Sequence, residues 1–343
     1  MAELSSLCYI TDMAKIRQFN IFQYSKVSKM LYTIAPDEKI SLWATLSGLP
    51  SDLVQNFLSL RFKKSPESYI AVGPEGEVKA FITLEKTAGN IRKWFIKRLF
   101  LTKNSFDEGS QLIDFVITKY GALGADTFVV LTDENDDTST GIFSKMCGFR
   151  LCSRQVICKL NNFDKSDGYE QQNFIKYKNS YAKAAAELYN ESLETHFRFS
   201  LEKEPAEFSA DTKSIKYVLK SDNGQIFTFC RARKMGENDY LTDFSISKGY
   251  EDRLGQIISG FYSLITTKFK ARNIYLLNRY YTCNAKEIEK VTVNNSEKIQ
   301  TKMLLVKDFY KPVRDSENIV NPAVIFKEIT GKPAFYSSKS LQK

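Results

Sequence analysis

The second half of this 343-residue chain repeats the pattern of its first half. The offset between equivalent positions stays between 146 and 148 residues. The equivalent positions are Gly76 and Gly224, Phe81 and Phe229, Gly109 and Gly255, and the run starting at Ala125 and that starting at Ala271. Because solenoid repeats are only about 20–50 residues long, a repeat of this length indicates two copies of a whole domain. The sequence therefore predicts domains at residues 1–162 and 174–315 and a tail at 316–343, with a polar, turn-rich linker at residues 161–173.

Hydrophobic periodicity predicts the same elements in each half. The first half has apolar helical patterns from residue 24 and from residue 51, and a hairpin whose turn is the Gly-Pro-Glu-Gly run ending at Gly76. The second half has a helical pattern from residue 180 and a hairpin about Asn223-Gly224, which is a strong turn signal. After each hairpin come a strand, a long amphipathic helix and further strands, at 92–101, 107–124, 126–136 and 154–160, and at 240–247, 250–269, 271–281 and 298–309. We therefore predict an α/β fold, α+β-like, in which a mixed and mostly antiparallel sheet is flanked by helices.

Composition limits the classes of protein that the chain can belong to. Hydrophobic residues make up 43% of it, which is enough to build two cores. The sequence contains no run of the roughly 20 apolar residues that a membrane span needs, and no signal-like N-terminus. We therefore expect a cytoplasmic protein without a membrane partner. The net charge of +9 fits a phosphate-rich cofactor, a tRNA or an ordinary solvated surface, and charge alone favours the ordinary surface.

The few histidine and cysteine residues exclude other chemistries. The chain has one histidine, His196, so a histidine-based zinc site or a Ser-His-Asp triad is not expected. The six cysteines follow no metal-binding spacing and are expected to be buried free thiols. His196 precedes the sheet of the second half, in a segment where we expect either a substrate loop or an ordinary surface histidine.

The order strand, helix, strand, helix, Gly148-Phe149 and strand resembles that of the GNAT (Gcn5-related N-acetyltransferase) superfamily. The resemblance covers residues 65–160 and, more faintly, 175–310, so the chain looks like a tandem GNAT protein. It implies two acyl-CoA acyltransferase domains, with acetyl-CoA as co-substrate and a small-molecule or peptide amine as acceptor.

In this superfamily the loop before the long helix presents backbone N–H groups to the CoA pyrophosphate, because a helix N-terminus attracts anions. The family loop, Gln/Arg-x-x-Gly-x-Gly/Ala, falls on Asn104, Asp107 and Gly109 in the first half, and only its last glycine is present. The resemblance implies cofactor contacts from Leu101 to Ser110, with Asn135 and Phe143 along the pantetheine arm. In the second half it implies contacts from Arg253 and Gly255. The alternative for both glycines is close packing of the helix against a strand.

The resemblance also implies a general base and a general acid for amine attack on the thioester. Asp243 lies on the second half's fourth strand, where family bases commonly lie, and Tyr281 follows its fifth strand. In the first half the usual tyrosine position falls near Phe143 or Ser144, with a one-residue slip before Gly148.

Three functions stay open from the sequence. The first is an N-acetyltransferase with one degenerate domain. The second is a Fem-like tandem protein that takes its acyl group from aminoacyl-tRNA. The third is a non-catalytic GNAT-fold binding module.

Overall fold

The computed structural model describes residues 14–34, 67–161, 173–293 and 295–309. By its internal contacts the chain divides into two units, Met1–Asp308 and Phe309–Lys343, and the sheet belongs to the first unit. The predicted second helix from residue 51, the linker and the predicted tail fall wholly or mostly outside the described residues. The division of residues 1–315 into two domains stays a prediction.

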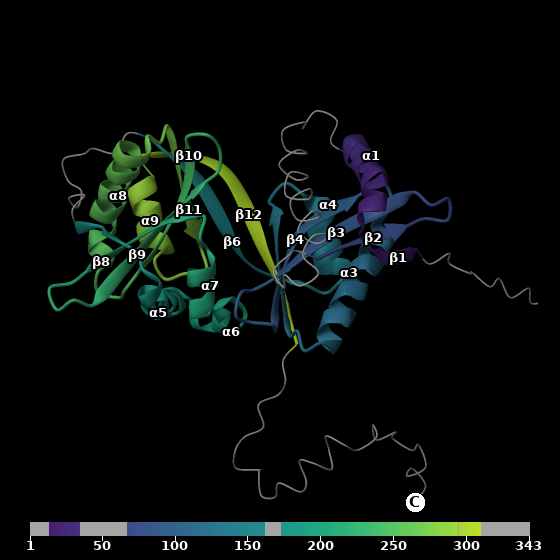
Figure 1. The fold of residues 1–343 in the computed structure, drawn as a ribbon, viewed down its shortest axis with the longest axis horizontal. Helices are drawn as coiled ribbons and strands as arrows, with labels where there is room; N and C mark the ends of the chain where they lie inside the picture. The colour runs from purple at the N-terminus through teal and green to yellow at the C-terminus, as the bar shows by residue number, and fades with distance from the viewer. Residues whose placement is uncertain (1–13, 35–66, 162–172, 294, 310–343) are drawn as a thin grey trace, which may run out of the picture. The chain divides into compact units, whose positions relative to one another are not determined.

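Among its described residues the first half contains six strands and three α-helices. Figure 1 labels them. Its strands are β1 (Lys15–Gln18), β2 (Glu67–Val72), β3 (Val78–Lys86), β4 (Lys93–Leu101), β5 (Thr127–Asp133) and β6 (Arg150–Leu160). Its helices are α1 (Tyr24–Ile34), α3 (Phe106–Ala122) and α4 (Asp137–Gly141), and a single π-helical turn, Ile142–Met146, continues α4.

The second half repeats these elements among the described residues. Its strands are β7 (Ile175–Lys176), β8 (Ile215–Lys220), β9 (Ile226–Lys234), β10 (Asp239–Ile246), β11 (Asn273–Arg279) and β12 (Ser296–Asp308). Its helices are α5 (Ala182–Ser192), α6 (Arg198–Leu201), α7 (Pro205–Ala210), α8 (Leu254–Phe269) and α9 (Ala285–Thr292). Short 3-10 turns precede α5, α6 and α8. The predicted hairpins, long helices and strands are confirmed, and the glycines of the two hairpin turns, Gly76 and Gly224, both have a φ of 79°.

The two halves share one sheet, because each contributes a strand to the other. Within the described residues twelve strands follow the order β1-β2-β3-β4-β5-β12-β6-β11-β10-β9-β8-β7. The last strand of the chain, β12, pairs antiparallel with β5 of the first half, and β6 pairs antiparallel with β11 of the second. β12 and β6 also pair with each other, so they form the centre of the sheet (Figure 1).

Alternating side chains along single strands show which helices cover which face. On β12, Leu305 packs in the core that contains α3, whereas Leu304 packs with α5, so α3 and α5 lie on opposite faces. On β9, Cys230 packs with α8 and Phe229 with α5. On β3, Ile82 packs with α3 and Phe81 with α1. One face therefore carries α3 and α8, and the other carries α1, α5, α6 and α7. We call the latter the α5 face.

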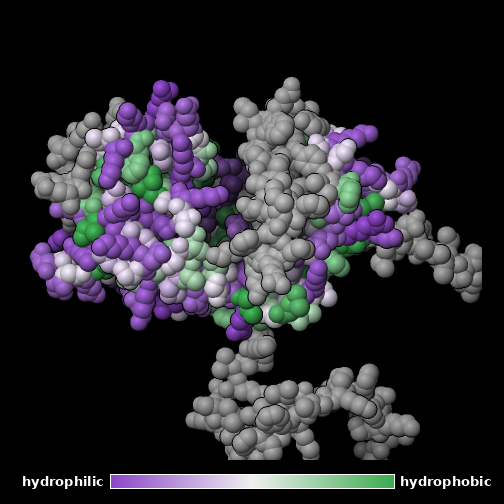
Figure 2. Space-filling model, viewed as in Figure 1, coloured by the Kyte–Doolittle hydropathy of each residue, from purple (hydrophilic) through white to green (hydrophobic). Residues whose placement is uncertain are grey.

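None of the described helices is long and apolar enough to cross a membrane. On the side of the molecule drawn in Figure 2, hydrophilic residues cover most of the second half.

Candidate active site

The fourth and fifth strands of each half pair in parallel only at their beginnings. β4 pairs with β5 from Lys93 to Ile96, and its residues from Arg98 to Leu101 pair with β3 alone. In the same way β10 pairs with β11 from Asp239 to Thr242 and then leaves it. Lys97 and Asp243 are thus the first residues beyond the parallel ladders, at equivalent positions. We call the gap where these two parallel strands separate the splay of that half. A charged side chain lies at the opening of each splay.

The splay of the first half is open to solvent. Lys97 is exposed and the residues from Arg98 to Leu101 are half-buried. A β-bulge interrupts the pairing of β3 and β4 between Ile96 and Arg98, which leaves Lys97 without a cross-strand partner in the register. The Lys97 ammonium lies 2.9 Å from the Glu85 carboxylate and 5.5 Å from the centre of the Phe95 ring.

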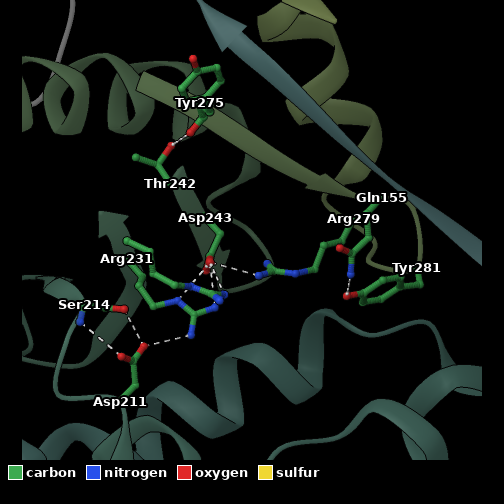
Figure 3. Close-up of polar contacts among 10 residues, drawn as sticks. Gln155, Asp211, Ser214, Arg231, Thr242, Asp243, Tyr275, Arg279 and Tyr281 are labelled. Carbon is green, nitrogen blue, oxygen red and sulfur yellow. Dashed lines mark hydrogen bonds and ion pairs between the residues drawn. The ribbon is translucent and has the colours of Figure 1, made fainter. Parts of the chain in front are cut away.

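The splay of the second half is closed by a buried ion-pair cluster (Figure 3). β10 is buried from Tyr240 to Ile246, and the Asp243 side chain is only 3% exposed. One carboxylate oxygen of Asp243 accepts two hydrogen bonds from Arg231 and forms ion pairs with three guanidinium groups. The nitrogens of Arg231, Arg279 and Arg233 lie 2.7, 3.1 and 3.6 Å from it.

This cluster fixes the protonation state of its members. Burial alone raises the pKa of a carboxyl, but the positive charges of Arg231, Arg279 and Arg233 more than offset it and hold the pKa of Asp243 well below its usual range. The Asp243 charge in turn raises the pKa of Arg279 despite burial. A carboxylate this strongly ion-paired is a weak proton acceptor. The geometry therefore favours a structural role for Asp243 over the general-base role that the sequence suggested.

Tyr281, the expected general acid, lies deep on the same face. Its hydroxyl accepts a hydrogen bond of 2.7 Å from the Gln155 side chain of β6, and burial raises the pKa of the phenol. Figure 3 draws Arg279 between Asp243 and Tyr281. Tyr281 keeps its proton, as an acid must, but it is only 4% exposed.

The equivalent positions of the two halves carry opposite charges. Lys97 of the first half corresponds to Asp243 of the second. Likewise Glu85 corresponds to Arg233, and Asp133, which ends β5, corresponds to Arg279, which ends β11. All six side chains belong to the α5 face, because they alternate in register with Phe95, Val129 and Phe229 of that core. In the first half two acidic side chains lie near one lysine, whereas in the second half arginine side chains surround one aspartate.

The expected cofactor loop of the first half adopts a tight turn between β4 and α3. Asn104 has a φ of 64°, in the left-handed region that asparagine tolerates. A Cβ on Gly109 would lie 2.5 Å from a methyl carbon of Leu101, so close packing of α3 on β4 explains this glycine. Ser110 is half-buried, with its hydroxyl 3.6 Å from the Cys147 sulfur. Asp107 lies in the first turn of α3 beside Glu108, which disfavours an anion there.

The equivalent loop of the second half differs in its contacts. A Cβ on Gly255 would meet only a methyl group of Val291 at 3.5 Å, an ordinary contact, so packing does not require this glycine. The Glu251 carboxylate accepts a 2.6 Å hydrogen bond from the backbone N–H of Gly249, just before α8. Arg253 stacks over Tyr250 and lines a hollow of about 470 Å³ with Phe227 and Lys220.

Phe143 and Asn135, which were both expected along the pantetheine arm, differ in burial. Phe143 is 1% exposed and packs edge-on against Phe149 in the α3 core, so it offers no surface to a pantetheine arm. Asn135 is exposed in the turn after β5. The π-helical turn Ile142–Met146 contains one more residue per turn than an α-helix, which explains the one-residue slip before Gly148.

His196 is a surface residue. Its side chain is 64% exposed, with the ring against Phe197 and one nitrogen 3.6 Å from the Glu194 carboxylate. The described residues contain no group of three or more His, Cys, Asp or Glu side chains able to hold a metal ion.

Sequence reasoning missed the charged residues around both splays. These are Glu85, Lys97 and Asp133 in the first half, and Arg231, Arg233 and Arg279 in the second. The 146–148-residue offset aligns these positions in the sequence, so a comparison of charge between the halves would reveal them.

No family model matches the sequence, and no curated protein matches it. Solved structures do. A GCN5-related N-acetyltransferase from Sphaerobacter thermophilus aligns with a TM-score of 0.57 at 9% identity, covering 89% of this chain and 98% of that one. A tandem GNAT protein from the clavulanic acid biosynthesis pathway aligns with a TM-score of 0.54 at 10% identity, covering 87% and 99%.

A fungal GCN5-related glucosamine N-acetyltransferase region aligns with a TM-score of 0.55 at 13% identity, covering 85% of this chain and 38% of that one. These likenesses and the splayed strands define the class: the chain has the GNAT fold. More particularly, it has the tandem arrangement of that fold. In this chain the described strands of the two halves join in one sheet. The fold and the tandem arrangement expected from the sequence are confirmed.

Proposed function

We propose that the first half is an acyl-CoA-dependent N-acetyltransferase, which transfers the acetyl group of acetyl-CoA to a primary amine. The second half then acts as a structural partner that has lost the chemistry. The observation that carries this proposal is the contrast between an open splay in the first half and a splay closed by the Asp243 cluster in the second.

The open splay suits an acyl-pantetheine arm. After Ile96, β4 no longer pairs with β5, so its backbone groups on that side can bond to the pantetheine amides. Leu101, Asn104, Gly109 and Ser110 then lie at the far end of the strand, near the CoA phosphates, with Asn135 after the neighbouring strand. Phe143 is left out of this proposed site because it is buried.

The charges of the first half suit an amine acceptor. Glu85 and Asp133 lie on the α5 face beside the splay, and carboxylates attract an ammonium group. In the second half the corresponding residues are Arg233 and Arg279, which repel a cation. This inversion supports assigning the acceptor site to the first half, whereas the sequence placed Asp243 and Tyr281 of the second half in the catalytic roles.

A non-catalytic binding module is the second candidate, and a specific observation favours it. The first turn of α3 carries Asp107 and Glu108, and the turn before α8 carries Glu251 and Asp252. Acids at a helix start repel a pyrophosphate, and they repel the phosphates of a tRNA equally. If this repulsion dominates, the protein binds acetyl-CoA weakly and transfers nothing.

Hydrogen exchange with and without acetyl-CoA tests the assignment on the intact chain. We expect slower exchange at residues 97–110 and 131–137, and no change at 243–255 and 277–283. Release of free CoA in the presence of primary amines should accompany it. Protection confined to the second half would refute the assignment, and binding without turnover would favour the binding module.

A further inference from the structure

Glu85 on β3 forms an ion pair with Lys97 while its carboxylate stays partly exposed. Its cross-strand partner on β4 is Phe95, so Glu85 lies on the side of β4 away from β5. Only its side chain reaches the opening of the splay, where it meets the bulged Lys97. Its side chain is 47% exposed and forms an ion pair of 2.9 Å with Lys97, which is itself 48% exposed. A carboxylate is thus held in a known place and remains accessible to a substrate.

The α5 face is the side from which an acceptor would reach this carboxylate. α3 covers the opposite face of β4, where Trp94 and Ile96 are buried in its core. On the α5 face, Val129 is covered by the second half, but two residues further along β5 Leu131 is 37% exposed. Among the described residues, the cover on β5 therefore ends at the splay, across from Lys97 on β4.

We propose that Glu85 is the proton acceptor of the first half, with Lys97 as the residue that positions it. This inference rests on the proposed acetyltransferase function. The acceptor ammonium gives one proton to the Glu85 carboxylate, and the freed amine attacks the thioester carbonyl carbon. A C–N bond forms and the C–S bond breaks. The second amine proton goes to the departing CoA thiolate, and Glu85 returns its proton to water.

The other charged groups of the splay fit this role less well. The Lys97 ammonium has no lone pair with which to accept a proton. Asp133 lies at the end of β5, two residues beyond Leu131, or about 7 Å along the strand, and one of its oxygens accepts a hydrogen bond from Gln300. In the second half Arg233 replaces Glu85, so the proton acceptor is missing where the splay is closed.

Kinetics of matched variants test the proposal. Acetyl-CoA would be assayed with 1,4-diaminobutane, 2-phenylethylamine and a lysine-containing tetrapeptide, following release of CoA. With the amine that reacts fastest, we expect Glu85→Gln to lower kcat about 100-fold or more while KM for acetyl-CoA stays within about threefold. Glu85→Asp should keep part of the activity. Glu77→Gln removes a partly exposed ion pair with Lys79 at the start of β3 and should leave kcat unchanged.

The charge swap Glu85→Lys with Lys97→Glu separates catalysis from structure. It restores the ion pair but moves the carboxylate to β4, so we expect normal thermal stability and a kcat still at least tenfold low. Full recovery of kcat in the swap would reduce Glu85 to a structural role. Loss of activity in Asp133→Asn but not in Glu85→Gln would transfer the role to Asp133. If wild-type protein releases no CoA with any amine, the proposed function fails instead.

Discussion

The two halves share one architecture but solve the same structural problem in opposite ways. Each must deal with a gap where its fourth and fifth strands separate. The second half fills the gap with Asp243 and its arginines, whereas the first half leaves it lined by half-buried side chains and an exposed ion pair. Under the proposed function only the first half carries out chemistry, so the second half can use the same gap for stability.

The largest expected difference concerns Asp243 and Lys97. Asp243→Asn leaves three guanidinium groups near a buried neutral amide, so we expect a loss of about 3–5 kcal/mol in the free energy of unfolding. Lys97→Gln at the equivalent position removes a solvent-exposed pair and should cost less than about 1 kcal/mol. Urea denaturation of both variants measures the two losses. Equal losses would contradict the view that only the second half is closed by charge.

The same comparison predicts a pH dependence. The pKa of Asp243 is depressed in the folded protein from an ordinary value of 3.8, so its contribution to stability is fully present above that value. The contribution declines as the pH falls below 3.8, because Asp243 then binds a proton in the unfolded chain but stays deprotonated in the folded protein. We expect the stability gap between wild type and Asp243→Asn to be wide at pH 7 and narrower at pH 3. Urea midpoints at both pH values check this, and a constant gap would refute it.

The glycines at the two long helices should respond differently to a methyl group. Gly109→Ala forces a Cβ against Leu101, so we expect a loss of about 1–2 kcal/mol in the free energy of unfolding. Gly255→Ala meets only an ordinary contact and should change stability by no more than about 1 kcal/mol, as a gain from helix propensity. Thermal unfolding of the pair measures the difference. The opposite order would mean that α8, not α3, is the tightly packed helix.

The smallest expected difference is at the hairpin turns, where the halves agree. Gly76 and Gly224 have the same φ of 79°, which an alanine adopts only with strain. Gly76→Ala and Gly224→Ala should each cost about 1–2 kcal/mol in the free energy of unfolding, and the two losses should agree within about 0.5 kcal/mol. Unequal losses, measured by denaturation, would show that the two hairpins differ in rigidity despite their common geometry.

Much of the fold could be predicted because its signals are local. The hairpin about Asn223-Gly224, the helical spacing in α3 and α8 and the apolar run of β5 each specify an element within a few residues. The candidate site could be predicted only in part. The repeat correctly placed Asp243 on the fourth strand of the second half. The sequence could not show that burial among Arg231, Arg233 and Arg279 lowers the pKa of Asp243 and makes it a weak proton acceptor.

The surroundings of Phe143 also could not be predicted from the sequence. The sequence places Phe143 near the end of the first half, but whether an aromatic side chain lines a cofactor or fills a core depends on what packs around it. Phe149 and the α3 core surround it, and both are contacts across several elements. The exchange of β6 and β12 is a stronger case, since strand partners more than 100 residues apart leave no pattern in a single sequence.

The sequence by itself determined the repeat, the order of helices and strands and the resemblance to the GNAT fold, because periodicity and turn residues act over short distances. Only the tertiary structure decided that the halves share strands, that one splay is closed by buried charge, and that Glu85 and Lys97 meet at the open one. Those outcomes depend on burial and on pairing between distant segments, and both arise only when the whole chain is packed.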